Sequence, residues 1–479
     1  MLLAAAGAIE FGLQAILPML LVRRLEPSTF GQYRLLWLIA NTALSIAPAF
    51  MPSSLFYFLP RAETGRRGVL VGNVLVYCLL AGAVSGLVTS GWNPWMQSAV
   101  RHLFVDTNGL SSVFLLFWVA ASVADVLPTA DNRIAWQAGA MIGVALLRTS
   151  LLVAAALTGC DIFRLALAIL AVAVFKLLSL LLYLARQREL RLLGYDGPLL
   201  RQQLVYALPF ALGNALFLMR AQGDQWIVIS LLTPALFATF SVASVVQPVS
   251  TLIRQPVINA MMPRLHAAHA HGAKAEIASL IARSNGAAGM LLLPVLGGLY
   301  AGAPEMVRLL YTARYQDAAP VMQVYLVGMA LNVLAVGHVL SAIGKGRFAA
   351  FSSFCCLGLS ILFGVVGLRL FGLPGAALGS VCTLAINELW SLRVIAGTLD
   401  VPVRSLLAWR AMGCTVAGTA AALWGATWVG THLAQTGLAL LIAQAVIYLA
   451  LFLLVFLLCD GRRQFDRMLG WRPVATLVP

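Results

Sequence analysis

The chain has 479 residues, of which 61% are hydrophobic and only 10% are charged. A soluble protein carries about 25% charged residues, so this composition excludes an ordinary soluble domain. The formal net charge is +15. On a soluble chain this excess would indicate nucleic acid, but here it is interpreted as a topology signal, and no nucleic-acid partner is expected.

Apolar runs of about 20 residues recur along the whole chain, and each is long enough to cross a ~30 Å hydrocarbon core as a helix. The first run starts at Leu2 and is expected to be a retained helix rather than a cleaved signal peptide. The sequence therefore predicts an all-α polytopic membrane protein with about 14 transmembrane helices. The expected spans are residues 2–24, 35–58, 69–90, 110–130, 134–157, 162–185, 205–231, 238–262, 281–303, 320–343, 349–369, 374–397, 409–430 and 435–459.

A short pattern occurs twice and suggests an internal duplication. Residues 25–33 read LEPSTFGQY and residues 232–240 read LTPALFATF, so both fit L-x-P-x-x-F-[G/A]-x-[Y/F]. Each copy follows one apolar run and precedes another. In a membrane protein, two related halves predict a binding site between them and a rocking motion around it.

Charge predicts the orientation of the chain, and the order of the spans predicts its division. With the N-terminus inside, about 20 of the 32 Lys and Arg residues fall on inner loops and the C-terminal tail, and about 8 fall outside. This bias places both termini in the cytoplasm. The expected parts are an N-lobe of helices 1–6 (1–185), a cytoplasmic connector (186–203), a C-lobe of helices 7–12 (204–397), helices 13–14 (398–459) and a basic cytoplasmic tail (460–479).

Four basic residues lie well inside predicted spans, away from the span ends: Arg148, Lys176, Arg220 and Arg254. Each costs about 2.5–3.5 kcal/mol at the centre of a bilayer, so the four cannot all face lipid. They must pair, reach the interface or line a wet cavity. The acids available for pairing are Glu10, Asp125, Asp224 and Glu388.

The four positions have different alternatives. Arg220 and Asp224 are four residues apart on one predicted helix, so a local pair explains them as well as a cavity does. Arg254 belongs to an acid-free polar stripe, which is either buried between helices or faces a cavity. Arg148 and Lys176 have no acid within one turn.

Arg24, at the outer end of the first span, reaches the interface or joins the cavity. A cavity lined by Arg148, Lys176, Arg220, Arg254 and Arg24 suits a polyanion, because Arg binds phosphate through two donors at once. The predicted ligand is a pyrophosphate or an acidic sugar.

Two carboxylates are candidates for ion coupling. Glu10 lies on the first span one turn before Gln14, and Asp224 lies on the seventh. A lone carboxylate in a membrane helix is a functional candidate by default, although a hydrogen bond to a neighbouring helix explains it equally. On the second span, Pro48 and Pro52 share one face and are candidates for gating. Proline bends a helix, and a fixed kink without motion is the alternative.

Four stretches resemble a known family. They are the hairpin at 25–33, Leu208-Pro209-Phe210 followed by Asp224-Gln225-Trp226, the connection at 303–320, and the glycine-alanine turn at 371–377. They look like the corresponding stretches of polysaccharide-biosynthesis membrane proteins. These are Wzx-type oligosaccharide flippases of the multidrug/oligosaccharidyl-lipid/polysaccharide (MOP) exporter superfamily. The second copy of the repeat departs from the pattern with Ala238 in place of glycine.

The resemblance implies two six-helix lobes around a central cavity, with helices 13 and 14 appended. It also implies movement of a polyprenyl-pyrophosphate-linked oligosaccharide from the inner to the outer leaflet by alternating access. The location is then the cell inner membrane. The expected partners are the lipid-linked oligosaccharide, membrane lipids and other proteins of polysaccharide assembly.

Two other functions were weighed. A cation-coupled multidrug exporter of the same superfamily would favour an acidic or apolar cavity, which the intramembrane bases oppose. An envelope glycan polymerase or ligase usually needs paired acids, and no D-x-D occurs in the chain. No enzyme activity is predicted. The sequence indicates no cofactor and no metal site, because the seven cysteines form no C-x-x-C pair.

Overall fold

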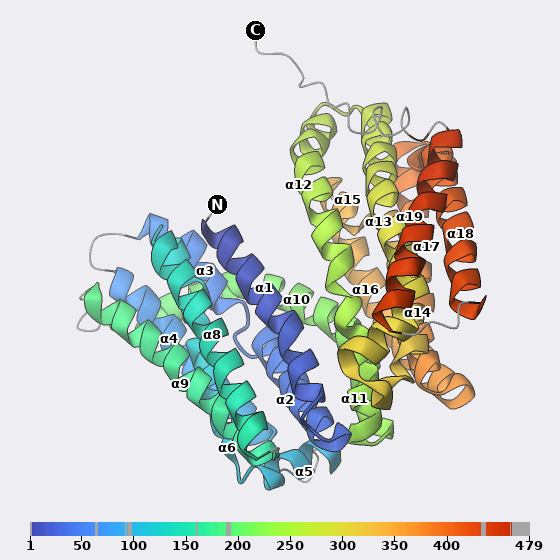
Figure 1. Cartoon of the computed structure of the whole chain (residues 1–479). Helices are drawn as coiled ribbons and strands as arrows, with labels where there is room; N and C mark the ends of the chain where they lie inside the picture. The colour runs from blue at the N-terminus through green and yellow to red at the C-terminus, as the bar shows by residue number, and fades with distance from the viewer. Residues whose placement is uncertain are drawn as a thin grey trace. The chain divides into compact units, whose positions relative to one another are not determined.

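The computed structural model describes residues 2–62, 66–91, 93, 98–159, 161–187, 193–432, 437–459 and 461. Residues 188–192 of the expected connector and residues 462–479 of the expected tail lie outside this described part. The described chain contains helices and turns but no β-strand. It divides into two compact units, residues 1–241 and 242–479 (Figure 1). The expected boundaries of the two lobes and the connector stay predictions.

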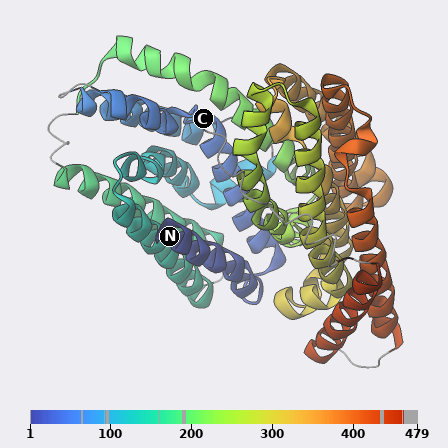
Figure 2. The ribbon, with the colours of Figure 1, turned by 90° about the horizontal axis from the view of Figure 1, so that it is seen from above.

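The first unit is a bundle in which α1 packs on α8, α8 on α9, α9 on α6, and α6 on α4. The long helix α10 packs along α2, α3 and α4 (Figure 2). The elements of the first unit are α1 (Leu2–Val22), α2 (Pro27–Ile46), α3 (Met51–Phe58), η1 (Leu59–Arg61), α4 (Arg67–Val88), α5 (Ser98–Asp106), α6 (Leu110–Ala120), η2 (Ala121–Asp125), α7 (Leu127–Ala130), α8 (Ile134–Thr158), α9 (Ile162–Arg186), α10 (Gly197–Leu231) and α11 (Pro234–Ala243).

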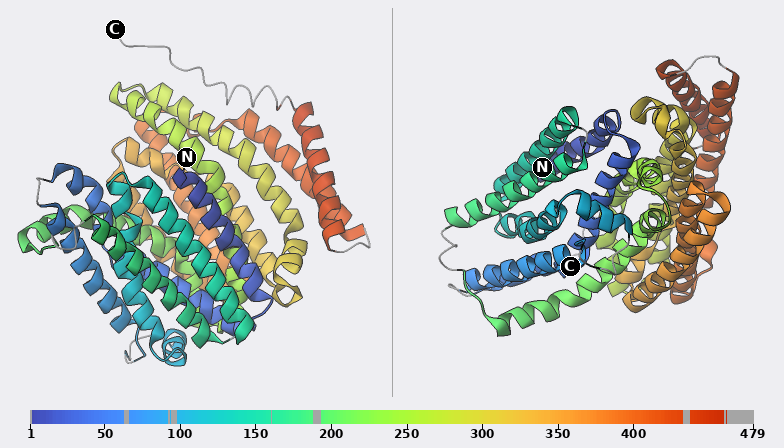
Figure 3. Two further views of the ribbon diagram at one scale, coloured as in Figure 1. Left: turned by 60° about the vertical axis from the view of Figure 1, so that its left-hand side comes forward. Right: turned by 90° about the horizontal axis from the view of Figure 1, so that it is seen from below.

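The second unit is built around α13, which packs against α12, α14, α18 and α19. Helices α12 and α13 run side by side (Figure 3), and α16 packs on α17. The elements of the second unit are η3 (Ser244–Val246), α12 (Pro248–Ala270), α13 (Lys274–Tyr311), η4 (Ala313–Tyr315), α14 (Ala318–Leu331), η5 (Asn332–Leu334), α15 (Gly337–Ala342), α16 (Gly346–Phe371), α17 (Leu373–Leu399), η6 (Val403–Leu406), α18 (Trp409–His432) and α19 (Leu438–Leu458).

Thirteen helical stretches of the described chain are long and apolar enough to cross a membrane. The helix α18 coincides with a further expected span but is not among these thirteen, although it packs closely on α19. The prediction of an all-α polytopic membrane protein is confirmed, with a span count near the expected 14.

The two copies of the repeated pattern begin helices in the same way. Pro27 is the first residue of α2 and Pro234 is the first residue of α11. Proline suits the first helical position because the backbone N–H that it lacks has no partner there. The copies also touch, since a Cβ atom added at Gly31 would lie 1.9 Å from the carbonyl oxygen of Pro234. The glycine of the first copy is therefore required for this close approach.

Four spans that the sequence predicts as continuous are interrupted. The second span breaks between α2 and α3, where Ala49 and Phe50 have φ angles of 45° and 61°. The expected bend near Pro48 and Pro52 is thus a break, because left-handed residues end a helix. The short 3₁₀ helices η2, η3 and η5 interrupt the spans at 110–130, 238–262 and 320–343.

Candidate functional site

A cavity of about 530 Å³ lies within the first unit, among α1, α2, α6, η2, α8 and α9. Its volume lies within the range of about 300–1,000 Å³ that is typical of small-molecule sites. The polar and aromatic residues of the lining are Glu10, Gln14, Tyr33, Arg34, Trp37, Asn41, Trp118, Asp125, Gln137, Arg148, Lys176 and Ser179.

Helical periodicity explains how one helix supplies several of these groups. Tyr33, Trp37 and Asn41 are four residues apart on α2, so they lie along one face. Across the cavity, α8 contributes Gln137 and Arg148, which lie about three turns apart on a helix of 25 residues. The lining is therefore supplied by several helices of the first unit that are packed together.

Arg148 is a buried cation that lines the cavity. The residue is only 8% exposed, and among the described residues neither Nε nor Nη2 has a hydrogen-bond partner. Its guanidinium lies 5.3 Å from the centroid of the Trp37 ring, a cation–π distance. A buried donor without a partner costs about 1–3 kcal/mol, so this arrangement is poor for stability and well suited to receiving an acceptor.

Lys176 has a partner that its own helix does not provide. Its Nζ atom lies 2.6 Å from Oδ2 of Asp125 in η2, and 4.5 Å from the centroid of the Trp118 ring. The lysine side chain is 7% exposed, whereas that of Asp125 is 55% exposed. The cation expected to be unpaired is therefore found at Arg148 and not at Lys176.

Glu10 lies at the same cavity on α1. Its Oε1 atom accepts a hydrogen bond of 2.8 Å from Nε2 of Gln14, one turn further along. Both side chains line the cavity. The two carboxylates, Glu10 and Asp125, share the cavity with three basic residues, so its character is mixed with an excess of positive charge.

Arg34 is a lining residue that the sequence reasoning missed. The second span was expected to begin at residue 35, which placed Arg34 outside the membrane. The helix in fact begins at Pro27, and Arg34 lies three residues before Trp37 on it. Proline at the first position of a helix was the signal that could have extended the span.

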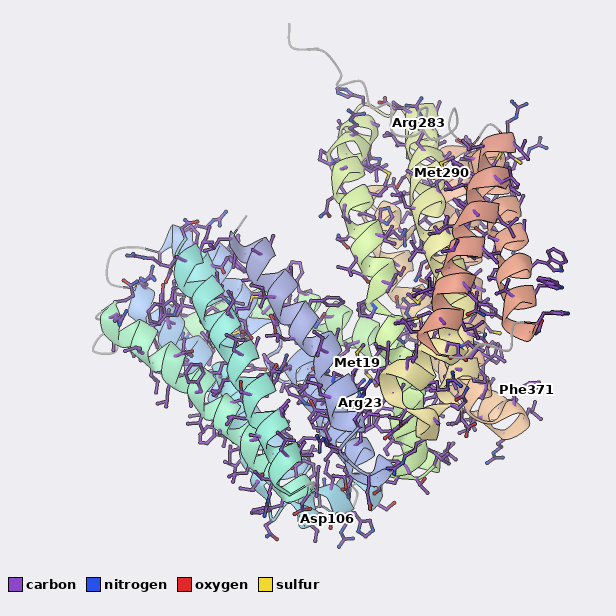
Figure 4. The ribbon with its side chains drawn as sticks, viewed as in Figure 1. Met19, Arg23, Asp106, Arg283, Met290 and Phe371 are labelled. Carbon is purple, nitrogen blue, oxygen red and sulfur yellow. The ribbon has the colours of Figure 1, made fainter. Side chains whose placement is uncertain are left out.

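The other candidate cations are not among the residues that line this cavity in the described part of the chain. Figure 4 shows Met19 and Arg23 near the end of α1, and Arg24 follows in an exposed turn. Arg220 lies on α10, and Arg254 lies on α12 in the second unit.

The remaining candidates are a carboxylate and two prolines. Asp224 on α10 is 3% exposed and accepts a hydrogen bond of 2.8 Å from the backbone N–H of Gln225. Pro48 and Pro52 are buried on either side of the break between α2 and α3. Their expected roles in ion coupling and gating stay predictions.

No group of three or more His, Cys, Asp or Glu side chains that could hold a metal ion is found in the described part of the chain.

The fold is similar to that of solved membrane transporters. A lipid II flippase, MurJ, in an inward closed conformation superposes with a TM-score of 0.72 at 11% identity, covering 98% of this chain and 99% of that one. A multidrug resistance MATE family transporter of the MOP superfamily, in an inward-facing conformation, superposes with a TM-score of 0.60 at 17% identity. This match covers 81% of this chain and 95% of that one.

A MOP superfamily transporter from Pyrococcus furiosus, described as having a binding pocket of reversed polarity, superposes with a TM-score of 0.54 at 14% identity. This match covers 84% of this chain and 96% of that one. At these identities the likeness concerns the fold. No curated protein matches the sequence.

A family model described as "Polysaccharide biosynthesis protein" matches residues 20–320. This region begins just before the first copy of the repeat and includes every basic residue of the cavity. By this match, the chain belongs to the family of polysaccharide biosynthesis proteins.

Proposed function

We propose that this protein moves a polyprenyl-pyrophosphate-linked oligosaccharide from the inner to the outer leaflet of the cell inner membrane by alternating access. Family membership and the transporter fold support movement of a lipid-linked precursor. The observation that carries the proposal is Arg148, a buried guanidinium in the cavity, two nitrogens of which have no hydrogen-bond partner among the residues that the structure describes. Such a group favours an anionic ligand over a neutral or cationic one.

Two cations of the cavity, Arg148 and Lys176, have distinct parts in the proposal. Arg148 donates to the pyrophosphate or to an acidic sugar, and its planar fork can meet two oxygens at once. The ring face of Trp37 holds Arg148 in place, and the ring face of Trp118 holds Lys176. Lys176 adds positive charge while it remains paired with Asp125.

The other predicted elements complete the proposal. Arg24 and Arg220 contact the substrate at other stages of its passage, Pro48 and Pro52 allow the second span to move, and Glu10 with Asp224 couples transport to an ion. Both termini lie in the cytoplasm, and proteins of polysaccharide assembly supply and receive the substrate.

A second candidate function is cation-coupled multidrug export, which a specific observation favours. Glu10 and Asp125 line the same cavity, and a carboxylate can hold a cationic drug or a proton. The two functions differ in a simple assay. Loss of the protein raises drug sensitivity only if it exports drugs.

The experiment measures the sidedness of the lipid-linked glycan in cells depleted of the protein. Spheroplasts are treated from outside with a sugar-modifying reagent that does not cross the membrane. Full-length glycan-lipid is expected to accumulate in a protected form. Glycan-lipid that remains as accessible as in undepleted cells would show that the protein does not flip this lipid.

Complementation then tests the cavity. Arg148→Gln is expected to leave the glycan-lipid protected. Arg101→Gln, the same change at an exposed arginine on α5 of the same unit, is the matched control and is expected to restore access. Restored access with Arg148→Gln would remove the cavity from the proposal.

A further inference from the structure

The second unit contains an interruption inside a membrane span. The helix α14 ends at Leu331, η5 covers Asn332–Leu334, and α15 begins at Gly337. Ala335 has an extended backbone with φ −68° and ψ 121°, so the regular helical hydrogen bonds are lost there. At membrane depth, backbone groups released from a helix require partners from the protein, because lipid offers none.

One peptide group of this interruption receives side chains from two other helices. The carbonyl oxygen of Ala335 accepts a hydrogen bond from Nη2 of Arg254 on α12. The N–H of the next residue, Val336, donates to Oε2 of Glu388 on α17 at 3.1 Å. These two atoms belong to the same peptide unit. The cation therefore meets the negative end of the peptide dipole, and the carboxylate meets the positive end.

Neighbouring contacts hold both charged side chains and the interruption in place. Nδ2 of Asn332 donates to Oγ of Ser250 at 3.1 Å, and Ser250 lies one turn before Arg254 on α12. Glu388 is 5% exposed and also accepts a hydrogen bond of 3.2 Å from Nδ2 of Asn387. Two hydrogen bonds, from Arg254 and to Ser250, thus join the interruption to α12, and one, to Glu388, joins it to α17.

We infer that Arg254 and Glu388 together clamp the 335–336 peptide and keep this span interrupted while the proposed transport proceeds. Arg254 is then a positioning residue that acts through the backbone of the tenth span. Its effect on transport arises from the rate of the conformational change and not from the affinity for substrate. This inference rests on the proposed function only in its transport readout, since the clamp itself is a property of the second unit.

The physical reason for the clamp is the cost of charge inside a membrane protein. A cation and a carboxylate within a span are retained when each is paired or hydrogen-bonded. Here each stabilises one end of a peptide dipole that would otherwise lack a helical partner. Removing either side chain leaves its peptide atom and the opposite charge poorly compensated, so the two variants are expected to have the same effect.

The first test needs no substrate. Val336 is 1% exposed, so a cysteine at this position is shielded while the clamp is closed. Val336→Cys is labelled with a membrane-permeant thiol reagent, and the chain with its seven native cysteines gives the background. Arg254→Gln and Glu388→Gln are each expected to speed labelling by about tenfold, the effect of replacing a hydrogen bond to a charged group by one to a neutral amide. Arg393→Gln, at an exposed arginine on α17, is the matched control and is expected to leave labelling unchanged.

The second test separates positioning from substrate contact. The purified protein in proteoliposomes is assayed with increasing amounts of a polyprenyl-pyrophosphate-linked glycan. Arg254→Gln and Glu388→Gln are both expected to lower the maximal rate by about tenfold, with the half-saturating amount unchanged within about twofold. Arg254→Lys keeps a single donor for the carbonyl of Ala335 and is expected to recover most of the rate.

The outcomes are distinct. Unchanged labelling in both glutamine variants overturns the clamp, whatever the transport assay gives. An increased half-saturating amount in Arg254→Gln, with normal transport in Glu388→Gln, makes Arg254 a substrate ligand instead. If labelling speeds up as expected but the wild-type protein moves no glycan-lipid, the clamp stands and the proposed function fails.

Discussion

Nζ of Lys176 lies 2.6 Å from Oδ2 of Asp125, although the two residues are 51 positions apart in the chain. The burial of the two partners is unequal, at 7% exposure for the lysine side chain and 55% for the aspartate. Without its partner, the carboxylate can still be hydrated at the cavity, whereas the ammonium cannot. Loss of the ion pair therefore destabilises the charged form of Lys176 more than that of Asp125.

This asymmetry predicts unequal effects on stability. Asp125→Asn is expected to lower the free energy of unfolding by about 1–3 kcal/mol, because it leaves a buried cation without its counter-charge. Lys176→Met is expected to cost less, because it leaves an exposed carboxylate and an apolar side chain against Trp118. Thermal unfolding of the purified variants measures the difference. A larger loss in Lys176→Met than in Asp125→Asn would show that burial does not govern the pair.

Arg148 is predicted to be retained for function at the expense of stability. Arg148→Gln is expected to raise the free energy of unfolding by about 1 kcal/mol, because fewer buried donors then lack a partner. The same variant is expected to reduce transport at least about tenfold, and Arg148→Lys to recover part of it as a point charge without the planar fork. Thermal unfolding and glycan-lipid sidedness are measured on the same variants. A variant that is both destabilised and fully active would contradict this account.

Glu10 is predicted to link transport to a proton gradient. In proteoliposomes, a gradient is expected to accelerate wild-type transport and to have no effect on Glu10→Gln, because the amide cannot exchange a proton. Gln14→Ala removes the hydrogen-bond partner but keeps the carboxylate, and it is expected to retain the dependence on the gradient. If Glu10→Gln responds to the gradient as the wild type does, Glu10 has no coupling role.

Gly31 is predicted to be intolerant of any side chain. Gly31→Ala places a Cβ atom 1.9 Å from the backbone carbonyl oxygen of Pro234, so a helix must shift. The expected loss is about 1–3 kcal/mol or more, seen as a lower unfolding temperature and less folded protein. Gly213→Ala is the control, because a Cβ atom there meets nothing within 4 Å. The control is expected to stabilise the helix by up to about 1 kcal/mol.

The positions of most spans followed from the sequence alone. The expected spans 134–157 and 162–185 correspond to α8 (Ile134–Thr158) and α9 (Ile162–Arg186). Helices that continue beyond the membrane were underestimated. The span expected at 281–303 is part of α13, which runs from Lys274 to Tyr311. An apolar run marks only the part of a helix within lipid, whereas its polar ends are helical for reasons of propensity and packing.

The interruptions at η2 and η5 could not be read from the sequence. Residues 121–125 and 332–334 contain neither glycine nor proline, the usual signals for a break. At the η5 break, the released peptide group between Ala335 and Val336 obtains its partners from Arg254 and Glu388 on two other helices. Such partners come from residues distant in the chain, so local patterns do not predict them.

The sequence by itself determined that the chain is a helical membrane protein with a duplicated motif and basic residues inside its spans. Hydrophobic length and charge composition are local properties, and lipid imposes one backbone solution on them. Only the tertiary structure decided how each intramembrane charge is compensated. It paired Lys176 with Asp125 and placed Arg254 on a backbone carbonyl. It also left two nitrogens of Arg148 in the cavity without a hydrogen-bond partner within the described part of the chain. Electrostatic partners act across a few ångströms of space, and the packing of helices sets that distance rather than their separation in the chain.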